Sequence, residues 1–295
     1  MKELVVISGK GGTGKTSIVA AFASLAKNAV FADCDVDAAD LHLILSPSVR
    51  QTTDFSGGKQ AFINAEECTR CGKCKEFCRF DAINYSVENG FTVDRLSCEG
   101  CRVCVEFCPA DAIEFRDVIN GKWFISDTRF GTMVHAKLGI AQENSGKLVS
   151  LIRKEAKRIA QEQNSEFIIA DGSPGIGCPV IASITGADLI VLVAEPTMSA
   201  QHDIERVIEL VRHFRIPAII CINKFDINSK IADEIEVNAR LNDIKVAAKI
   251  PYDNAVTKAQ IEGKTIIEYA NNAITENVKT LWQSVMDVLN YKEKN

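Results

Sequence analysis

The sequence predicts an α/β fold, in which a mostly parallel, doubly wound sheet is interrupted by an inserted α+β segment rich in cysteine. Three observations support this prediction. The chain begins with a strand–loop–helix–strand pattern, and its later apolar runs FIIA, LIVLVA and AIICI do not alternate with polar residues. Eight of the eleven cysteines fall between residues 68 and 108. Apolar runs without alternation are typical of strands that are covered on both faces.

The expected elements follow one another along the chain. An apolar strand, an alanine-rich helix and a second strand are expected at residues 4–8, 15–27 and 29–34. Helical periodicity then fades, and it returns after the last cysteine run. There, helices are expected at 146–163, 199–214, 229–241 and 265–289, the last either continuous or broken, and strands at 167–170, 189–193, 218–222 and 244–250. We therefore assign residues 1–57 and 124–295 to the α/β domain and residues 58–123 to the insert.

The composition argues against several classes of function. A net charge of −5 leaves no basic excess to neutralise phosphates, so nucleic-acid binding is not expected. No apolar run approaches the length of a membrane span, and the polar face of the last helix carries little basic charge, so no stable membrane association is expected. The first residues, MKELVVIS, lead directly into a strand rather than a signal peptide. We expect a cytoplasmic protein whose cysteines bind metal instead of forming disulfides.

Residues 9–16, GKGGTGKT, match the phosphate-binding pattern G-x-x-x-x-G-K-[ST]. Glycines let backbone N–H groups converge on phosphate oxygens, Lys15 supplies positive charge, and the Thr16 hydroxyl can bind Mg²⁺. The motif follows a strand and opens a helix, which is the context that it requires. The sequence therefore predicts a P-loop NTPase domain that binds ATP and Mg²⁺. The residues expected to contact the nucleotide here are Gly9, Lys10, Gly11, Gly12, Thr13, Gly14, Lys15, Thr16 and Ser17.

Two cysteine runs, CTRCGKCKEFC at 68–78 and CEGCRVCVEFC at 98–108, share the spacing C-x₂-C-x₂-C-x₃-C of bacterial [4Fe–4S] ferredoxins. In this pattern three close thiolates bind one cluster and the fourth reaches the other. The alternative, zinc, usually takes C-x₂-C pairs that are separated by a longer spacer. We therefore expect a 2[4Fe–4S] ferredoxin-like insert. Cluster I would be bound by Cys68, Cys71, Cys74 and Cys108, and cluster II by Cys98, Cys101, Cys104 and Cys78.

The two runs belong to an internal repeat. Residues 68–83 and 98–113 correspond at an offset of 30, down to a shared DAI at the end of each. We expect the two halves to fold as a pseudo-symmetric pair. They differ after the fourth cysteine, where Arg79 replaces the usual proline that is present as Pro109. Arg79 either lies near cluster II and raises its redox potential, or is exposed to solvent.

The loop also contains an early lysine, and its form KGGTGKT resembles the deviant loop of the MinD-type ATPases. That family includes chromosome-partitioning ATPases and the nitrogenase iron protein. The resemblance implies ATP-dependent dimerisation, as a homodimer or as a heterodimer with a related ATPase. It also implies that Lys10 reaches across the interface to the partner's nucleotide, and that Lys10, Lys15 and Asp35 are the catalytic residues.

Other segments resemble further family motifs. In ADCDVD, Asp35 matches the residue that activates the attacking water and Asp33 lies near the water shell of the metal; the alternative is that these carboxylates cap the next element. In DGSPG, Asp171 is implied to hold Mg²⁺ through water and Gly175 to lie near the γ-phosphate. Weaker signals imply that Asn223 contacts adenine and that Pro251 and Tyr252 close over the ring.

As a whole, the chain resembles a subfamily of MinD-superfamily ATPases that contains an inserted ferredoxin domain and is related to Mrp-type ATPases. The subfamily is associated with metal–sulfur cluster assembly and with small proteins resembling nitrogenase-cofactor-binding domains. A redox or cluster-accepting partner of this kind is therefore implied. Cys178 lies seven residues after Asp171, where the nitrogenase iron protein has a cluster ligand. Because residues 109–170 contain no second cysteine, Cys178 is either a buried structural residue or a transient contact for a cargo cluster.

Three functions fit these observations. The first is ATP-driven electron transfer within a metal–sulfur maturation system, which we favour because permanently bound clusters conduct electrons well. The second is an ATP-dependent scaffold or carrier of iron–sulfur clusters. The third is a non-catalytic regulatory module that responds to redox state and ATP.

Overall fold

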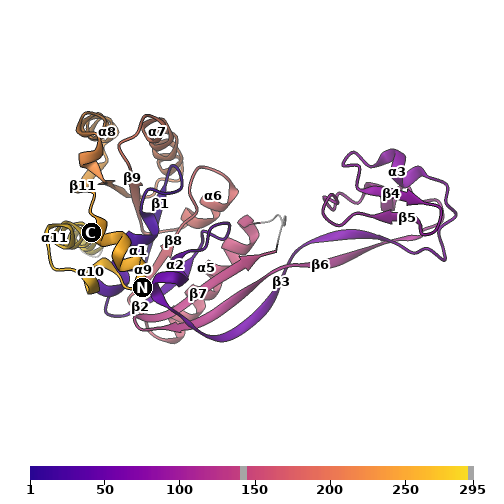
Figure 1. Cartoon of the computed structure of the whole chain (residues 1–295), viewed down its shortest axis with the longest axis horizontal. Coiled ribbons are helices and arrows are strands. Elements are labelled where there is room, and N and C mark those ends of the chain that lie inside the picture. The colour runs from indigo at the N-terminus through magenta and orange to yellow at the C-terminus, as the bar shows by residue number, and fades with distance from the viewer. Residues whose placement is uncertain (140–144, 292–295) are drawn as a thin grey trace. The chain divides into compact units, whose positions relative to one another are not determined.

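The structure is a computed structural model that describes residues 1–139 and 145–291 (Figure 1). The chain divides into two compact units. The first comprises Met1–Thr52, Trp123–Lys137 and the chain from Ser145 onward, and the second is formed mainly by Thr53–Lys122.

The first unit is built on a mostly parallel sheet. Among the described residues the strand order is β11-β10-β9-β1-β8-β2-β7-β6-β3, and the pairings from β11 to β7 are parallel. The last two strands, β6 and β3, continue into the second unit. The strands are β1 (Lys2–Ser8), β2 (Ala29–Asp33), β3 (Ser48–Ile63), β6 (Ile113–Thr128), β7 (Gly131–Leu138), β8 (Phe167–Asp171), β9 (Leu189–Ala194), β10 (Ala218–Asn223) and β11 (Lys245–Ile250).

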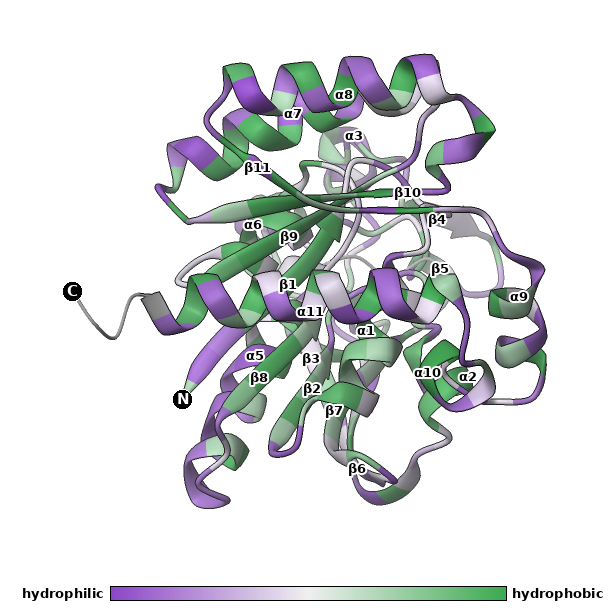
Figure 2. Ribbon diagram, turned by 90° about the vertical axis from the view of Figure 1, so that its left-hand side faces the viewer, coloured by the Kyte–Doolittle hydropathy of each residue, from purple (hydrophilic) through white to green (hydrophobic). Residues whose placement is uncertain are grey.

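Helices cover both faces of this sheet, as the continuous apolar strands predict (Figures 1 and 2). Figure 2 shows hydrophobic residues filling β8 and β9, whereas hydrophilic and hydrophobic residues alternate along α7, α8 and α11. The helices are α1 (Lys15–Leu25), α2 (Leu41–Leu45), α5 (Ser145–Glu162), α6 (Cys178–Ile184), α7 (Met198–His213), α8 (Ser229–Leu241), α9 (Asn254–Ile261), α10 (Ile266–Tyr269) and α11 (Ala273–Tyr291), with a 3₁₀ turn η1 (Phe225–Ile227).

The helix predicted at 265–289 is broken, which is one of the two forms expected from the sequence. Thr265 and Glu268 form a reciprocal capping box that begins α10, and extended backbone at Ala270 ends that helix before α11 begins. The apolar face of α11 packs into the core, as expected, through Ile274, Val278, Leu281, Val285 and Leu289. Within the described residues, no helix has both the length and the hydropathy needed to span a membrane.

The second unit is small and internally repeated. It contains an antiparallel pair, β4 (Ile83–Ser86) and β5 (Gly90–Val93), two short helices, α3 (Lys73–Phe77) and α4 (Val103–Glu106), and the ends of β3 and β6. Backbone hydrogen bonds repeat at the 30-residue offset: Asn64 N–H donates to Ala112 O (2.8 Å) and Asp94 N–H to Ala82 O (2.7 Å). Asp81 and Asp111 share φ values of 50° and 49°. The predicted pseudo-symmetry of the two halves is therefore confirmed.

Candidate functional site

The phosphate-binding pattern forms the loop between β1 and α1. Gly14 precedes the first residue of α1 with φ 90°, and a Cβ at this position would collide with the side-chain amide nitrogen of Asn223. Glycine is therefore required here both by the backbone conformation and by the close approach of Asn223. No side chain caps α1, so its first N–H groups are left to an anion.

Lys15 is buried at the start of α1, between Asp35 in the loop after β2 and Asp171 at the end of β8. Its Nζ donates to Asp35 Oδ2 (3.0 Å) and to Asp171 Oδ1 (2.6 Å). Burial alone would lower the pKa of Lys15, but the two carboxylates outweigh it and the pKa is raised. The structure thus brings together Lys15, Asp35 and Asp171, three of the residues singled out in the sequence.

The carboxylates around Lys15 have unused acceptors. Burial raises the pKa of Asp35, and Lys15 partly offsets the shift. Burial, and then the charge of Asp171, raise the pKa of Asp33 well above its usual value. The Oδ2 atoms of Asp33 and Asp171 and the Thr13 Oγ1 are buried without a hydrogen-bond partner among the described residues. Such oxygens are the ligand type that Mg²⁺ and its water shell prefer.

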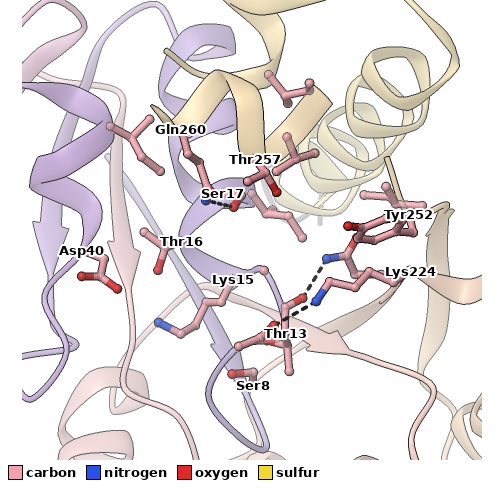
Figure 3. A pocket seen from close by; sticks show the side chains of 18 of the residues that line it. Ser8, Thr13, Lys15, Thr16, Ser17, Asp40, Lys224, Tyr252, Thr257 and Gln260 are labelled. Atoms are coloured by element: carbon pink, nitrogen blue, oxygen red, sulfur yellow. Dashed lines mark hydrogen bonds between the residues drawn. The ribbon is translucent and has the colours of Figure 1, made fainter. Parts of the chain in front are cut away.

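A cavity of about 500 Å³ extends from this loop toward α9 (Figure 3). Thr16 and Ser17 lie at its phosphate-binding end, where Ser17 Oγ accepts a hydrogen bond from Gln260 Nε2 (2.8 Å). The predicted adenine residues Asn223, Pro251 and Tyr252 line the same cavity. Its volume is within the range of small-molecule sites, about 300–1,000 Å³.

The sequence did not single out Lys224, although it follows Asn223 directly. Asn223 Nδ2 donates to Thr13 O (2.7 Å), and Lys224 Nζ donates to Gly12 O (3.1 Å) and Glu195 Oε1 (3.2 Å). These side chains therefore support the phosphate-binding loop from the end of β10. The lining residues contributed by α9 were also missed, because the short helix has a weak periodic signal.

Lys10 points to residues of its own chain. Its Nζ donates to Thr197 Oγ1 (2.8 Å) and to Ser199 Oγ (3.3 Å), and lies 3.9 Å from Glu195 Oε2. Gly9 and Gly11 flank it in the loop, and Gly175 N–H donates to Ser8 O beneath the loop (2.8 Å). The inter-subunit role of Lys10 stays a prediction.

In the second unit, the eight cysteines of the two runs line two separate cavities. One cavity is lined by Cys68, Cys71, Cys74 and Cys108. The other is lined by Cys98, Cys101, Cys104 and Cys78. Burial and then the three neighbouring thiols of its cavity raise the pKa of Cys104 to about 11. Each cavity therefore combines three thiols of one run with the last thiol of the other.

All eleven cysteines are free thiols. Within the described residues, no three or more His, Cys, Asp or Glu side chains are arranged so that they could hold a single metal ion. Arg79 is exposed, which favours the second alternative for that residue. Cys178 is exposed at the start of α6, so its interpretation as a buried structural residue is wrong. Cys34 and Cys221 are buried.

Comparisons with known proteins agree with the first unit. Residues 4–266 match the CobQ/CobB/MinD/ParA nucleotide binding domain family (CbiA). The uncharacterized protein MJ0578 of Methanocaldococcus jannaschii is 32% identical over 290 residues, which cover 97% of each chain. MJ0579 of the same organism is 26% identical over 284 residues, covering 91% of this chain and 94% of the relative.

Solved structures show the same fold. MinD of Pyrococcus horikoshii in complex with Mg-ADP is 16% identical, with a TM-score of 0.57 over 96% of this chain and 95% of that one. MinD in the MinC:MinD complex of Aquifex aeolicus is 18% identical, with a TM-score of 0.57 over 97% of this chain and 96% of that one. Because the match covers most of the sequence and includes the loop that surrounds Lys15, the chain belongs to the CobQ/CobB/MinD/ParA family of nucleotide-binding P-loop proteins.

Proposed function

We propose that this chain is an ATP-hydrolysing iron–sulfur protein that couples nucleotide-dependent dimerisation to electron transfer in metal–sulfur cluster or cofactor maturation. One observation carries the proposal. The same chain contains a nucleotide-sized cavity lined by Lys15 and Asp35, with Asp171 bonded to Lys15, and two cavities that are each lined by four thiols. The nucleotide-sized cavity supports ATP hydrolysis, and the two thiol-lined cavities support bound clusters.

In the proposed hydrolysis, ATP and water yield ADP and phosphate. The N–H groups at the start of α1 and the Lys15 ammonium bind the β- and γ-phosphates, while Thr16 and the water-bridged Asp171 hold Mg²⁺. Asp35 orients the attacking water. Lys15 donates to Asp35 and Asp171 through two of its three N–H groups, so the third is left for phosphate. The ammonium would then contact phosphate, the loop that follows β2 and the end of β8 together.

We propose that ATP also assembles the active dimer, with an identical chain or with a related ATPase. Lys10 would leave Thr197 and Ser199 and reach the partner's nucleotide, where its charge stabilises the developing negative charge. Asn223, Pro251 and Tyr252 would bind adenine, with Gly175 near the γ-phosphate.

The four-thiol cavities fit [4Fe–4S] clusters by the chemistry of their donors. Both donor sets consist only of thiols, and the bound clusters would supply one-electron transfer. Zinc would need its thiolates gathered around one ion, and no three such ligands are arranged in this way among the described residues. The exposed Cys71 and Cys101 lie at the rims of the cavities. An acceptor protein, such as a small protein that binds a metal–sulfur cofactor, would dock near these rims.

A second function, cluster delivery, is favoured by the exposure of Cys178. Cys178 lies at the start of α6 and is seven residues from Asp171, so the nucleotide loop and the thiol share one segment. A carrier needs an accessible ligand, and this cysteine supplies one. Transfer of iron from reconstituted protein to an apo-ferredoxin, compared between the unchanged chain and Cys178→Ala, tests this alternative.

An anaerobic redox titration followed by EPR, with and without Mg·ATP, tests the main proposal. We expect two four-iron clusters per chain and a midpoint potential that changes when Mg·ATP is added. The Lys15→Ala variant is the control, because it should retain the clusters and lose the nucleotide-dependent change. Potentials that do not respond to nucleotide would refute the coupling, and a chain that binds no iron and sulfide would refute the whole proposal.

A further inference from the structure

The two halves of the cysteine-rich unit share a backbone conformation in the segment between each strand and the cysteine run that follows it. Asn64 Oδ1 accepts from Glu66 N–H, and Asp94 Oδ1 accepts from Leu96 N–H, both at 3.1 Å. With the shared backbone hydrogen bonds described above, these contacts align residues 60–64 at the end of β3 with residues 90–94 of β5.

The side chains of the two strands break this symmetry at one position. Gln60 on β3 is buried, and its Nε2 donates to the carbonyls of Arg95 (2.7 Å) and Cys98 (3.3 Å). The equivalent position on β5 is Gly90, which has no side chain to contact the loop before Cys68. A side-chain clamp therefore holds the segment that enters the second run, and the clamp has no counterpart at position 90.

A second contact shows the same asymmetry independently. A Cβ at Gly100 would collide with the carbonyl oxygen of Lys59, so β3 packs directly against the loop between Cys98 and Cys101. Gly100 has φ 62°, and its equivalent, Arg70, has φ 56° and carries a full side chain. The two loops therefore share a backbone conformation, but β3 approaches the second loop closely enough to exclude a side chain.

Gln60 also carries an energetic cost. Its Oε1 is buried and has no hydrogen-bond partner among the described residues, which is unfavourable for a buried amide. The favourable contacts of Gln60 are the two donations by its Nε2, and both go to carbonyls of the segment that enters the second cysteine run. Groups that orient the ligands of a metal centre tune both its affinity and its redox potential.

We propose that Gln60 is a positioning residue that makes the two cluster sites unequal, by holding the Cys98 loop against β3. This inference rests on the proposed function. The site of Cys98, Cys101, Cys104 and Cys78 is the stiffer one, so its cluster loses iron more slowly and differs in potential from the cluster in the other site.

The test compares Gln60→Met with Thr92→Met, which changes an exposed residue on β5, in the reconstituted full chain. The variants Cys71→Ala and Cys101→Ala assign the two EPR signals. In Gln60→Met we expect the signal of the Cys98 site to shift in potential and to be lost to an iron chelator roughly tenfold faster. The signal of the Cys68 site, and both signals in Thr92→Met, should keep the values of the unchanged chain.

Equal changes in both signals of Gln60→Met, or a change confined to the Cys68 site, would overturn the inference while leaving the proposed function intact. So would a Gln60→Met variant with unchanged potentials and unchanged iron loss. If the unchanged chain shows no cluster signal after reconstitution, the proposed function fails and the inference fails with it.

Discussion

Lys15 is held by two carboxylates, Asp35 and Asp171, which are far apart in the sequence. A lysine buried at this depth is stable as a cation because both acceptors lie within hydrogen-bond distance. Its ammonium group is therefore already positioned at the start of α1, where phosphate binds. The ammonium group is therefore in place before the nucleotide binds.

We expect Asp35→Asn to lower ATP hydrolysis by about 10²–10⁴-fold, because an amide does not accept the proton of the attacking water. Nucleotide affinity should change little, since Asp171 still holds Lys15. Steady-state phosphate release and ADP binding measure the two effects. The change also separates the proposed functions, because a purely regulatory module would keep its response to ATP without hydrolysis. Loss of ADP binding would show that Asp35 acts mainly in the fold of the loop.

The buried His135 on β7 should make the free energy of unfolding depend on pH. Burial, and then His42 in a stacked contact at 6.5 Å, lower the pKa of His135 to about 4, and its Nε2 lies 2.8 Å from Ser126 Oγ. The unfolded chain binds a proton at the usual pKa near 6.5, whereas the folded chain does not. The stabilisation is thus complete above pH 6.5 and falls, by up to about 3 kcal/mol, as the pH drops toward 4.

Denaturant unfolding between pH 7 and pH 4.5 measures this effect. The difference between the unchanged chain and His135→Gln isolates it, because the carboxylates titrate equally in both. We expect the variant to lose less stability than the unchanged chain over this interval. Identical slopes for the two proteins would contradict the assignment.

Among the elements, the β1–α1 loop depends on Gly14. Gly14→Ala should weaken nucleotide binding strongly, because the methyl group collides with the Asn223 amide and the backbone has φ 90°. Gly186→Ala is the matched control, since its φ is 79° but its Cβ would meet open space. The control should lose only about 1 kcal/mol of stability and keep its affinity, as measured by calorimetry. Equal loss of affinity in both variants would exclude the steric explanation.

The start of α10 depends on the capping box of Thr265 and Glu268. Glu268 also binds Arg129 through both carboxylate oxygens, each at 2.7 Å, while Arg129 Nη1 donates to Leu45 O (3.0 Å). One carboxylate therefore joins the start of α10 to the turn between β6 and β7. The side of the cavity formed by α9 and α10 is attached to that turn through this residue.

We expect Thr265→Ala to cost about 1 kcal/mol in the free energy of unfolding, since it removes the acceptor for the Glu268 N–H. Thr280→Ala, on the exposed face of α11, is the control and should change stability by less. Urea unfolding of both variants measures the difference. An equal cost for the two would mean that the cap contributes nothing specific.

At the scale of the whole molecule, the two units have separate hydrophobic cores. The first core joins α1, α10 and α11 to the sheet, and the second consists of Ala61, Cys74, Ile83 and Ile113 with their neighbours. The cysteine thiols form part of the small core. Stability of the second unit should therefore depend on what its thiols bind, while that of the first depends on nucleotide.

Calorimetry of the reconstituted chain should resolve this difference. Mg·ADP at a hundredfold excess over its dissociation constant should stabilise the transition of the first unit by about 2.7 kcal/mol. Removal of iron with a chelator should lower only the transition of the second unit. Hydrogen exchange identifies which residues open in each transition. If both treatments shift every transition together, the two units unfold as one.

Part of this structure follows from local sequence alone. The helix α8 begins and ends at the predicted residues because its periodicity is regular, and the three closely spaced thiols of each run line one cavity. In contrast, β3 and β6 were not predicted. Their polar residues resemble loops, and strands of this kind are specified by pairing with distant neighbours.

The P-loop family and the phosphate-binding loop could be predicted from local sequence, because each depends on residue types at short, fixed spacings. The folded arrangement, in contrast, is needed to show which groups meet across long separations. It placed Asp35 and Asp171 on Lys15, directed Lys10 to Thr197 in its own chain, and set Gln60 against the Cys98 loop. These contacts arise from strand order and packing, which bring together side chains whose distance along the chain carries no local signal.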